Sequence, residues 1–265
     1  EHVPSAQAAG PVELADAIVE SAKTTFRKKY IEEGLSHDTE NLVPLVDWMA
    51  KNRMNVLVCP ADYEGRGHVR WDRFRETITP EIRKRGMMIE VGGHGYQSYL
   101  RPSQYFGEHP EWFGLLDGER SSNPHTVFCI ANEEARAEIL RNVETYIRSH
   151  PEIDIFDLWP PDGDRWCECD ACASIGSPEE RQAYLIREAE RTIKTERDLT
   201  FEIIAYSNYT DPPRQEMPES VLVDFAPIRR SFRSDITEDD GKNRYYYEKL
   251  REWRKKHSGN LSVYT

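Results

Sequence analysis

Short apolar runs alternate with longer segments of helical spacing along most of this chain, and this alternation constrains the fold more than any other feature. Two of the runs, at 55–60 and 201–207, are almost continuously apolar, which is typical of parallel strands covered on both faces. Seven strands are predicted, at residues 25–31, 55–60, 87–91, 153–160, 201–207, 221–227 and 261–265. The sequence therefore predicts an α/β fold built on a parallel sheet.

Amphipathic helices are expected between the predicted strands. In the first of them, Leu42, Val46 and Met49 recur at the spacing of one helix face. Asn132 precedes two glutamates and is expected to cap another helix, and Gly86 is expected to end a third. The predicted helices span residues 38–52, 71–85, 132–149, 177–197 and 245–257. Strands and helices that alternate in this way favour a barrel or a doubly wound sheet.

The length of 265 residues suits a single (β/α)8 barrel of the TIM type, which typically takes about 250 residues. We expect residues 1–24 to form a lead-in segment and residues 25–265 to form the barrel domain. Seven strands are one fewer than a closed barrel needs, so we expect a barrel truncated in or after the seventh strand. Residues 95–131 show no clean helical period and are expected to form a large loop on the catalytic face.

The charge of the chain bears on its partners. Its 35 basic and 47 acidic side chains give a net charge of -12 that is spread along the sequence, which argues against nucleic acid or an anionic membrane as the main partner. No stretch approaches the roughly 18 apolar residues of a membrane span. The first residues carry no signal-peptide pattern, although a mature secreted protein would lack one too. The composition favours a neutral or polar small substrate.

The segment 157–172, which follows the fourth predicted strand, is the densest in reactive side chains. Carboxylates at the carboxyl end of a barrel strand point toward the substrate, and Trp159 and Trp166 offer flat faces of the kind on which sugars stack. Asp162 is the first candidate for a proton donor to a glycosidic oxygen, because burial beside either tryptophan would favour its protonated form. The alternative is a turn in which this carboxylate caps backbone amides.

Polar side chains also follow the third, fifth and sixth predicted strands. His94 and Tyr96 come after glycines that would let the backbone approach a ligand, and we expect both to contact a sugar. The alternative for His94 is a ring that is hydrogen-bonded to backbone. Tyr206, Arg229 and Arg230 are expected on the same face, where an arginine can bind a carboxylate through two parallel hydrogen bonds.

Four of the five cysteines are candidates for a metal site. Cys167, Cys169 and Cys172 offer three thiolates within six residues, a spacing that suits zinc. Cys129 is the expected fourth ligand because it lies at the end of the long loop on the same face, just before the next predicted helix, whereas Cys59 ends a strand and is expected to be a buried apolar residue. A structural zinc ion is one interpretation, and a disulfide with a spare thiol or inert reduced thiols are the others. Four thiolates would close the site, which argues against a catalytic metal.

Several longer motifs in the sequence resemble a known protein family. They are AKNRMN at 50–55, EVGGH at 90–94, EHPEWF at 108–113, WPPDG at 159–163, WCECDAC at 166–172, AYS at 205–207 and FAPI at 225–228. Over residues 25–265 they resemble the domain of unknown function 4838 family. That family is regarded as a glycoside-hydrolase-like barrel related to α-glucuronidases and hexosaminidase-type enzymes, and it is common in bacteria that degrade polysaccharides.

The resemblance implies a substrate class and a place for the acid. Related barrels carry their general acid after the fourth strand, which supports Asp162 and makes Asp164 its nearest rival. They often carry a retaining nucleophile after the seventh strand, which would lie beyond Thr265. Polysaccharide degradation also implies a periplasmic or extracellular location and further domains of the same protein.

Three functions remain open on the sequence. The first is a glycoside hydrolase acting on a poly- or oligosaccharide, with Asp162 as acid and with Arg229 or Arg230 meeting a uronic carboxylate. The second is a non-catalytic carbohydrate-binding barrel with a structural zinc site. The third is a metal-dependent hydrolase that uses the cysteine cluster. The substitution Asp162→Asn separates the first two, because it should abolish turnover and leave binding nearly intact.

Overall fold

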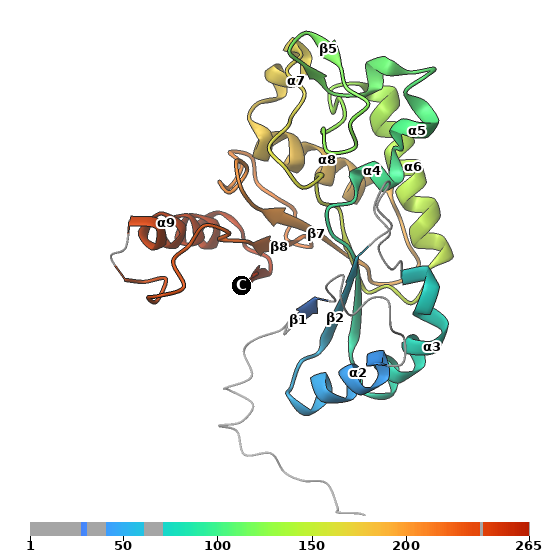
Figure 1. The fold of residues 1–265 in the computed structure, drawn as a ribbon, viewed down its shortest axis with the longest axis vertical. Helices are drawn as coiled ribbons and strands as arrows, with labels where there is room; N and C mark the ends of the chain where they lie inside the picture. Colours follow the sequence, from blue (N-terminus) through green and yellow to red (C-terminus); the bar gives the residue numbers. More distant parts are fainter. Residues whose placement is uncertain (1–27, 31–40, 61–70, 239–240, 265) are drawn as a thin grey trace, which may run out of the picture.

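The computed structural model describes residues 28–30, 41–60, 71–238 and 241–264, and in this part of the chain seven strands form one parallel sheet (Figure 1). They pair in chain order, so each strand lies beside the next one along the sequence. All seven correspond to predicted strands, which confirms the predicted α/β class and the parallel sheet. The strands are β1 (Lys28–Tyr30), β2 (Val56–Pro60), β3 (Met88–Gly92), β6 (Ile155–Asp157), β7 (Thr200–Ala205), β8 (Leu222–Phe225) and β9 (Leu261–Val263).

Five longer helices connect these strands within the described residues. They are α2 (Leu42–Lys51), α3 (Trp71–Lys84), α6 (Glu133–Ser149), α8 (Pro178–Thr192) and α9 (Gly241–Lys256). Helix α3 packs against β2 and β3, and α8 packs against β7. Asn132 caps α6 as predicted, because its Oδ1 accepts a hydrogen bond from the Ala135 amide at 2.9 Å. Gly86 follows α3 with a φ of 65°, a backbone conformation that favours glycine and ends the helix.

Two helices differ from their predicted bounds. Helix α8 ends at Thr192 instead of continuing to residue 197, because Ile193 adopts an extended backbone with φ −84° and ψ 109°. Helix α9 begins at Gly241, four residues before the predicted start at 245. The predicted lead-in segment 1–24 and the first residues of the predicted helix 38–52 lie outside the described residues.

Residues 95–131 contain more secondary structure than the single loop that was predicted. The segment forms helices α4 (Tyr96–Tyr99) and α5 (Pro102–Tyr105), the 3-10 helix Pro110–Trp112 and a hairpin of β4 (Leu115–Leu116) and β5 (Glu119–Arg120). Helix α7 (Asp170–Ile175) was also missed. Elements of two to six residues are too short to leave a periodic pattern in the sequence. Together with α8 they form the part of the molecule at the top of Figure 1.

The two faces of the sheet carry different side chains, because strand residues alternate between the faces. One face packs against the helices in the main core, to which Leu57, Ile89, Phe156, Phe201, Val223 and Phe225 belong. On the opposite face, a small apolar layer is made by Val56, Val58, Ile155 and Leu222. Toward the carboxyl ends of the strands, this apolar layer gives way to the buried acids Glu90, Asp157 and Glu202.

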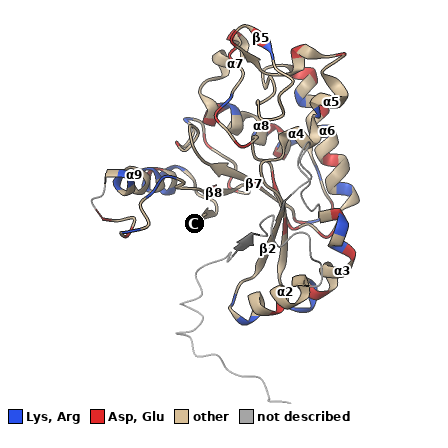
Figure 2. Ribbon diagram, viewed as in Figure 1, with Lys and Arg blue, Asp and Glu red and all other residues tan. Residues whose placement is uncertain are grey.

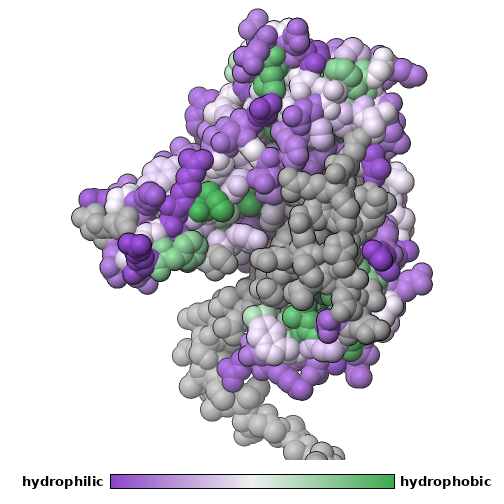
Figure 3. All heavy atoms as spheres, viewed as in Figure 1, coloured by the Kyte–Doolittle hydropathy of each residue, from purple (hydrophilic) through white to green (hydrophobic). Residues whose placement is uncertain are grey.

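Charged side chains of both signs lie along the outer surfaces of the helices (Figure 2). Hydrophilic residues cover most of the described surface in the view of Figure 3. One ion pair joins the end of α3 to the segment before β6, with Arg83 Nη1 at 2.8 Å from Asp154 Oδ2. Within the described residues, no helix combines the length and the apolar character that a membrane span requires.

Candidate active site

Three polar side chains converge beyond the carboxyl ends of β3, β6 and β7. His94 follows β3, Asp162 lies in the loop after β6, and Tyr206 follows β7 directly. The Tyr206 hydroxyl donates a hydrogen bond to Oδ1 of Asp162 at 3.1 Å. Nε2 of His94 lies 3.9 Å from the same oxygen. Substrates of parallel α/β proteins bind at this end of the sheet, so the three groups define a candidate active site.

Glycines bring the backbone of β3 close to β6 immediately below this site. A Cβ atom at Gly92 would lie 2.4 Å from the Cβ atom of Asp157, so only glycine allows this approach. The amide of Gly93 then donates a hydrogen bond to Oδ2 of Asp157 at 2.9 Å. The glycines are expected to let the backbone approach a ligand, and in the structure Gly92 approaches the neighbouring strand. The contacts of Gly92 and Gly93 tie β3 to β6 directly before His94.

His94 is held by backbone on one side and faces the site on the other. Its Nδ1 lies 2.7 Å from the carbonyl oxygen of Pro160. Because a carbonyl only accepts hydrogen bonds, Nδ1 carries a proton, and in the neutral ring Nε2 is then the acceptor facing Asp162. The imidazole also contacts the rings of Trp159 and Tyr206, each with centroids 5.4 Å apart. The backbone partner expected as the alternative for this histidine is therefore present, and its contact with a sugar stays a prediction.

Asp162 has a polar environment, and its side chain is 52% exposed. The prediction that Trp159 or Trp166 buries this carboxylate is wrong for the described residues. Both tryptophans are themselves buried, at 3% and 6% exposure, and the ring of Trp166 packs against Tyr209 at 5.4 Å. Burial, followed by the negative charge of Asp162, raises the pKa of Tyr206 to about 12. The tyrosine hydroxyl therefore stays protonated and can keep donating to Asp162.

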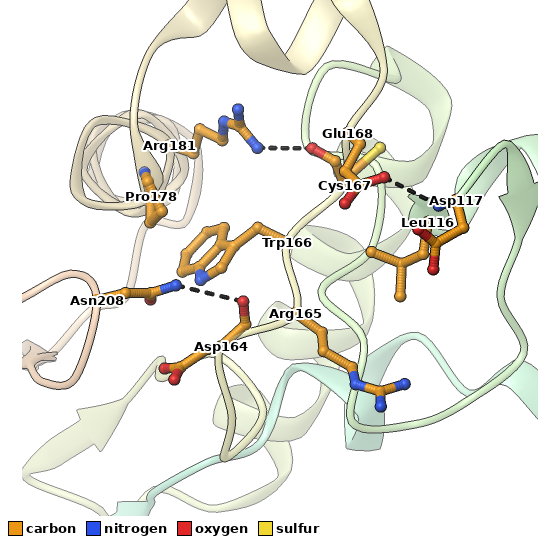
Figure 4. A pocket seen from close by; sticks show the side chains of 10 residues that line it. All are labelled: Leu116, Asp117, Asp164, Arg165, Trp166, Cys167, Glu168, Pro178, Arg181 and Asn208. Atoms are coloured by element: carbon orange, nitrogen blue, oxygen red, sulfur yellow. Dashed lines mark hydrogen bonds between the residues drawn. The ribbon is translucent and has the colours of Figure 1, made fainter.

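Asp164, the rival acid, is tied to the loop after β7. The Ser207 hydroxyl donates a hydrogen bond to Asp164 Oδ1 at 2.5 Å, and the Asn208 side-chain amide donates to the Asp164 carbonyl at 3.2 Å. Ser207 adopts a φ of 48°, which is uncommon for a residue other than glycine. Figure 4 shows the second of these bonds at the mouth of an open pocket of about 450 Å³. Besides Asp164 and Asn208, its lining includes Leu116, Arg165, Trp166, Glu168 and Arg181.

The remaining predicted sugar contacts separate into exposed and buried groups. Arg229 is exposed and lines a second pocket of about 370 Å³ together with Ser207 and Tyr245. The guanidinium of Arg230 lies over the ring of Phe232, with its central carbon 4.0 Å from the ring centroid. Tyr96 is 2% exposed and packs against Phe128, so its ring belongs to the core. The expectation that Tyr96 presents its ring to a ligand is therefore wrong.

The sequence analysis missed a group of three buried acids on the inner strands. Carboxylate oxygens of Glu90, Asp157 and Glu202 all lie within 4.8 Å of one another, and each residue is at most 1% exposed. Each acid interrupts an otherwise apolar strand, and in the structure it faces away from the helices.

The four cysteines predicted as ligands lie together at one side of the pocket. The sulfurs of Cys129, Cys167, Cys169 and Cys172 all lie within 4.8 Å of one another. Hydrogen bonds from the Cys129 and Cys172 thiols lower the pKa of Cys167. All five cysteines of the chain are described, and none is in a disulfide. Cys59 is buried in the main core, as expected.

Comparison with solved structures shows a glycoside-hydrolase-like fold. The chain is similar to a β-N-acetylhexosaminidase from Bacteroides fragilis, with a TM-score of 0.54, 13% identity, and coverage of 86% of this chain and 49% of that one. It is also similar to an O-GlcNAc hydrolase from Thermobaculum terrenum, with a TM-score of 0.53, 12% identity, and coverage of 90% and 47%. The chain thus spans about half the length of these proteins, and at this identity the likeness is one of fold.

The sequence comparisons give a family and no characterised relative. A search among curated proteins finds no match. The family model for the domain of unknown function DUF4838 matches residues 2–265, almost the whole sequence. This agrees with the resemblance seen in the motifs around His94, Asp162 and the cysteines. The chain therefore belongs to the DUF4838 family.

Proposed function

We propose that this protein is a glycoside hydrolase that acts on an oligosaccharide or polysaccharide, with Asp162 as the general acid. The observation that carries the proposal is the convergence of Asp162, Tyr206 and His94 beyond the carboxyl ends of three parallel strands. In the same proposal the sheet is part of a (β/α)8 barrel. Support comes from seven strands that pair in chain order and from the fold of the B. fragilis hexosaminidase.

The geometry suits proton donation by Asp162. Its carboxyl group is half exposed, so a glycosidic oxygen can reach it. The Tyr206 hydroxyl orients the carboxyl group through one of its oxygens, Oδ1. Asp164 is the weaker candidate because Tyr206 and His94 converge on Asp162, whereas the bonds of Asp164 run to Ser207 and Asn208 in one loop, contacts that suit a role in shaping the pocket.

Arg229 favours an acidic sugar as part of the substrate. It is exposed, lines a pocket beside Ser207, and its positive charge acts on Tyr206. A guanidinium binds a carboxylate with two parallel hydrogen bonds, which would select a uronic acid. Arg230 is the weaker candidate, since its guanidinium already stacks on Phe232.

The test uses the leaving-group dependence of hydrolysis. The substrates are N-acetylhexosaminides and uronides, each prepared with a p-nitrophenyl and with an alkyl leaving group. A general acid contributes about 10²- to 10⁴-fold when the leaving group needs a proton. The p-nitrophenolate ion leaves without one, so Asp162→Asn should lower kcat by about 10²-fold or more on the alkyl glycoside and by less than about tenfold on the p-nitrophenyl glycoside.

The matched control is Asp198→Asn. Asp198 is exposed and precedes the amino-terminal end of β7, whereas the candidate site lies beyond the carboxyl end of that strand. It should leave both rates unchanged. An equal loss on both leaving groups would show that Asp162 is not the acid. A protein that binds the oligosaccharides but hydrolyses none of the glycosides would support the alternative function, a carbohydrate-binding barrel without turnover.

A further inference from the structure

The sulfur atoms of the four clustered cysteines are spaced like the ligands of one metal ion with tetrahedral coordination. Cys129 Sγ lies 3.6 Å from Cys169 Sγ and 3.7 Å from Cys172 Sγ. Zinc binds thiolate sulfur at about 2.3 Å, which places the sulfurs of a tetrahedral site about 3.8 Å apart. A disulfide would require a separation of about 2.05 Å. The spacing therefore matches a metal ion and not a covalent bond.

Backbone amides point at the same sulfurs. The amide of Leu115 lies 3.3 Å from Cys167 Sγ, and that of Ala131 lies 3.4 Å from Cys172 Sγ. The amide of Cys172 lies 3.5 Å from Cys169 Sγ. Donors of this kind stabilise the negative charge of metal-bound thiolates. The guanidinium of Arg120, with Nη1 at 3.9 Å from Cys167 Sγ, adds a positive charge beside them.

Cys129, Cys167 and Cys172 form a small buried cluster of their own, and among the described apolar residues Leu115, Ala131 and Cys169 pack against it. The segments that carry the cysteines are also joined by backbone hydrogen bonds, from the Cys129 amide to the Trp112 carbonyl and from the Glu168 amide to the Leu115 carbonyl, each at 2.8 Å. A metal ion bound by the four thiolates would add to this stabilisation, as it does in small zinc-binding domains.

We propose that Cys129, Cys167, Cys169 and Cys172 bind one zinc ion. All four ligand positions are then filled by protein, so the ion has no open position for water or substrate and is structural. Two cysteines come from the ends of well-separated segments, Cys129 before α6 and Cys167 after the loop that carries Asp162. The ion would join these segments across the top of the molecule.

The contacts of Cys167 show what the zinc ion would position. Its carbonyl accepts a hydrogen bond from Arg181 at 2.7 Å (Figure 4). The amide of the next residue, Glu168, donates to the Leu115 carbonyl at 2.8 Å. The ring of Trp166, the residue directly before Cys167, points between Pro178 and Asn208 and forms part of the pocket wall (Figure 4). The site would therefore hold one wall of the pocket that Asp164 borders, and it does not depend on which reaction the protein catalyses.

Metal content and metal coordination test the assignment. The chain, purified without chelators, should contain about one zinc per molecule, and X-ray absorption at the zinc edge should show four sulfur neighbours at about 2.3 Å. Cys169→Ser should reduce the zinc content at least tenfold under mild chelation. Cys59→Ala is the control, because Cys59 is buried in the main core away from the cluster, and it should keep one zinc.

A second measurement uses the wild-type protein and therefore tests the assignment even if the cysteine variant does not fold. Wild-type protein treated with a strong chelator should unfold at a temperature several degrees lower, and added zinc should restore the original value. Iron in place of zinc, a coordination sphere with fewer than four sulfurs, or a disulfide among the four cysteines in mass spectra of the unreduced protein would each overturn the assignment. So would a melting temperature that neither chelation nor zinc changes.

Discussion

The hydroxyl of Tyr206 donates a hydrogen bond to Oδ1 of Asp162 at 3.1 Å, so the first residue after β7 orients the candidate acid after β6. At this distance the charge of Asp162 acts on the ionisation of Tyr206. Burial is the largest cause that raises the pKa of Tyr206 to about 12, and the charge of Asp162 is the next. Removal of that charge should therefore lower the tyrosine pKa only part of the way toward its ordinary value of about 10.

The substitution Asp162→Asn tests this link directly. The pKa of Tyr206 can be followed by NMR with carbon-13 in the tyrosine ring, and Tyr206→Phe assigns the signal. In Asp162→Asn the signal should titrate at lower pH than in the wild type. In Asp198→Asn it should not move. An unchanged pKa in Asp162→Asn would mean that the two side chains are not in contact in solution.

The close approach of Gly92 to Asp157 predicts a large stability effect. In Gly92→Ala the new Cβ would meet the Asp157 Cβ and carbonyl oxygen, both at 2.4 Å, on a backbone with φ 150°. Overpacking and backbone strain together should lower the free energy of unfolding by about 3 kcal/mol or more.

Gly86→Ala is the matched control for that substitution. Gly86 also has a positive φ, at 65°, but nothing lies within 4 Å of an added Cβ. Its cost should be limited to the backbone term of about 1 kcal/mol. Urea unfolding of the two variants measures the difference. An equal loss of unfolding free energy in the two variants would show that the contact with Asp157 is not what excludes a side chain at Gly92.

The ion pair between Asp72 and His150 predicts a stability that depends on pH. His150 Nε2 lies 2.5 Å from Asp72 Oδ1, and its Nδ1 lies 2.7 Å from the carbonyl of Tyr146. Burial lowers the pKa of His150, but the bond and charge of Asp72 outweigh it and the net shift is upward. The bond from His150 lowers the pKa of Asp72.

The signs of these shifts set the pH window. The raised histidine pKa adds stability that is complete below about 6.5 and is lost as the pH rises through the folded value. The lowered aspartate pKa adds stability that is complete above about 3.9 and is lost as the pH falls through the folded value. Asp72→Asn should therefore destabilise the protein by about 0.5–1 kcal/mol near pH 5 and by less near pH 9. The effect is small because solvent partly screens this ion pair. A loss that is the same at both pH values in thermal unfolding would contradict this account.

Arg229 predicts substrate selectivity. If it binds a uronic carboxylate, Arg229→Gln should raise KM for a uronide by about tenfold or more and leave KM for a neutral glycoside unchanged. Arg233→Gln provides the control, because Arg233 is exposed in the same loop and outside the pocket. Steady-state kinetics on the two substrates measures the split. A similar KM change on both would assign Arg229 a general role in holding the loop.

The strands and the cysteine cluster could be predicted because their signals are local. A run such as 201–207 shows a buried strand through its composition alone, and three cysteines within six residues must lie close together in any fold. Cys129 could be chosen as the fourth ligand from its place at the end of the long loop, and the structure brings its sulfur to the cluster.

The environment of each site residue could not be predicted, because it depends on which way a loop turns after its strand. Trp159 and Trp166 follow β6 as expected, but the loop folds both indoles inward and leaves Asp162 exposed. Glu90 and Glu202 were overlooked for a related reason. An acid inside an apolar run indicates a polar interior only when the direction of the neighbouring strands is known.

Ser207 and Asn208 are adjacent in the chain but border different pockets, Ser207 the one with Arg229 and Asn208 the one with Asp164. Ser207 lines one pocket while its hydroxyl holds Asp164, which lines the other. Under the proposed function, a substitution at Ser207 would therefore alter both binding spaces at once, and the two could not be tuned independently through this residue.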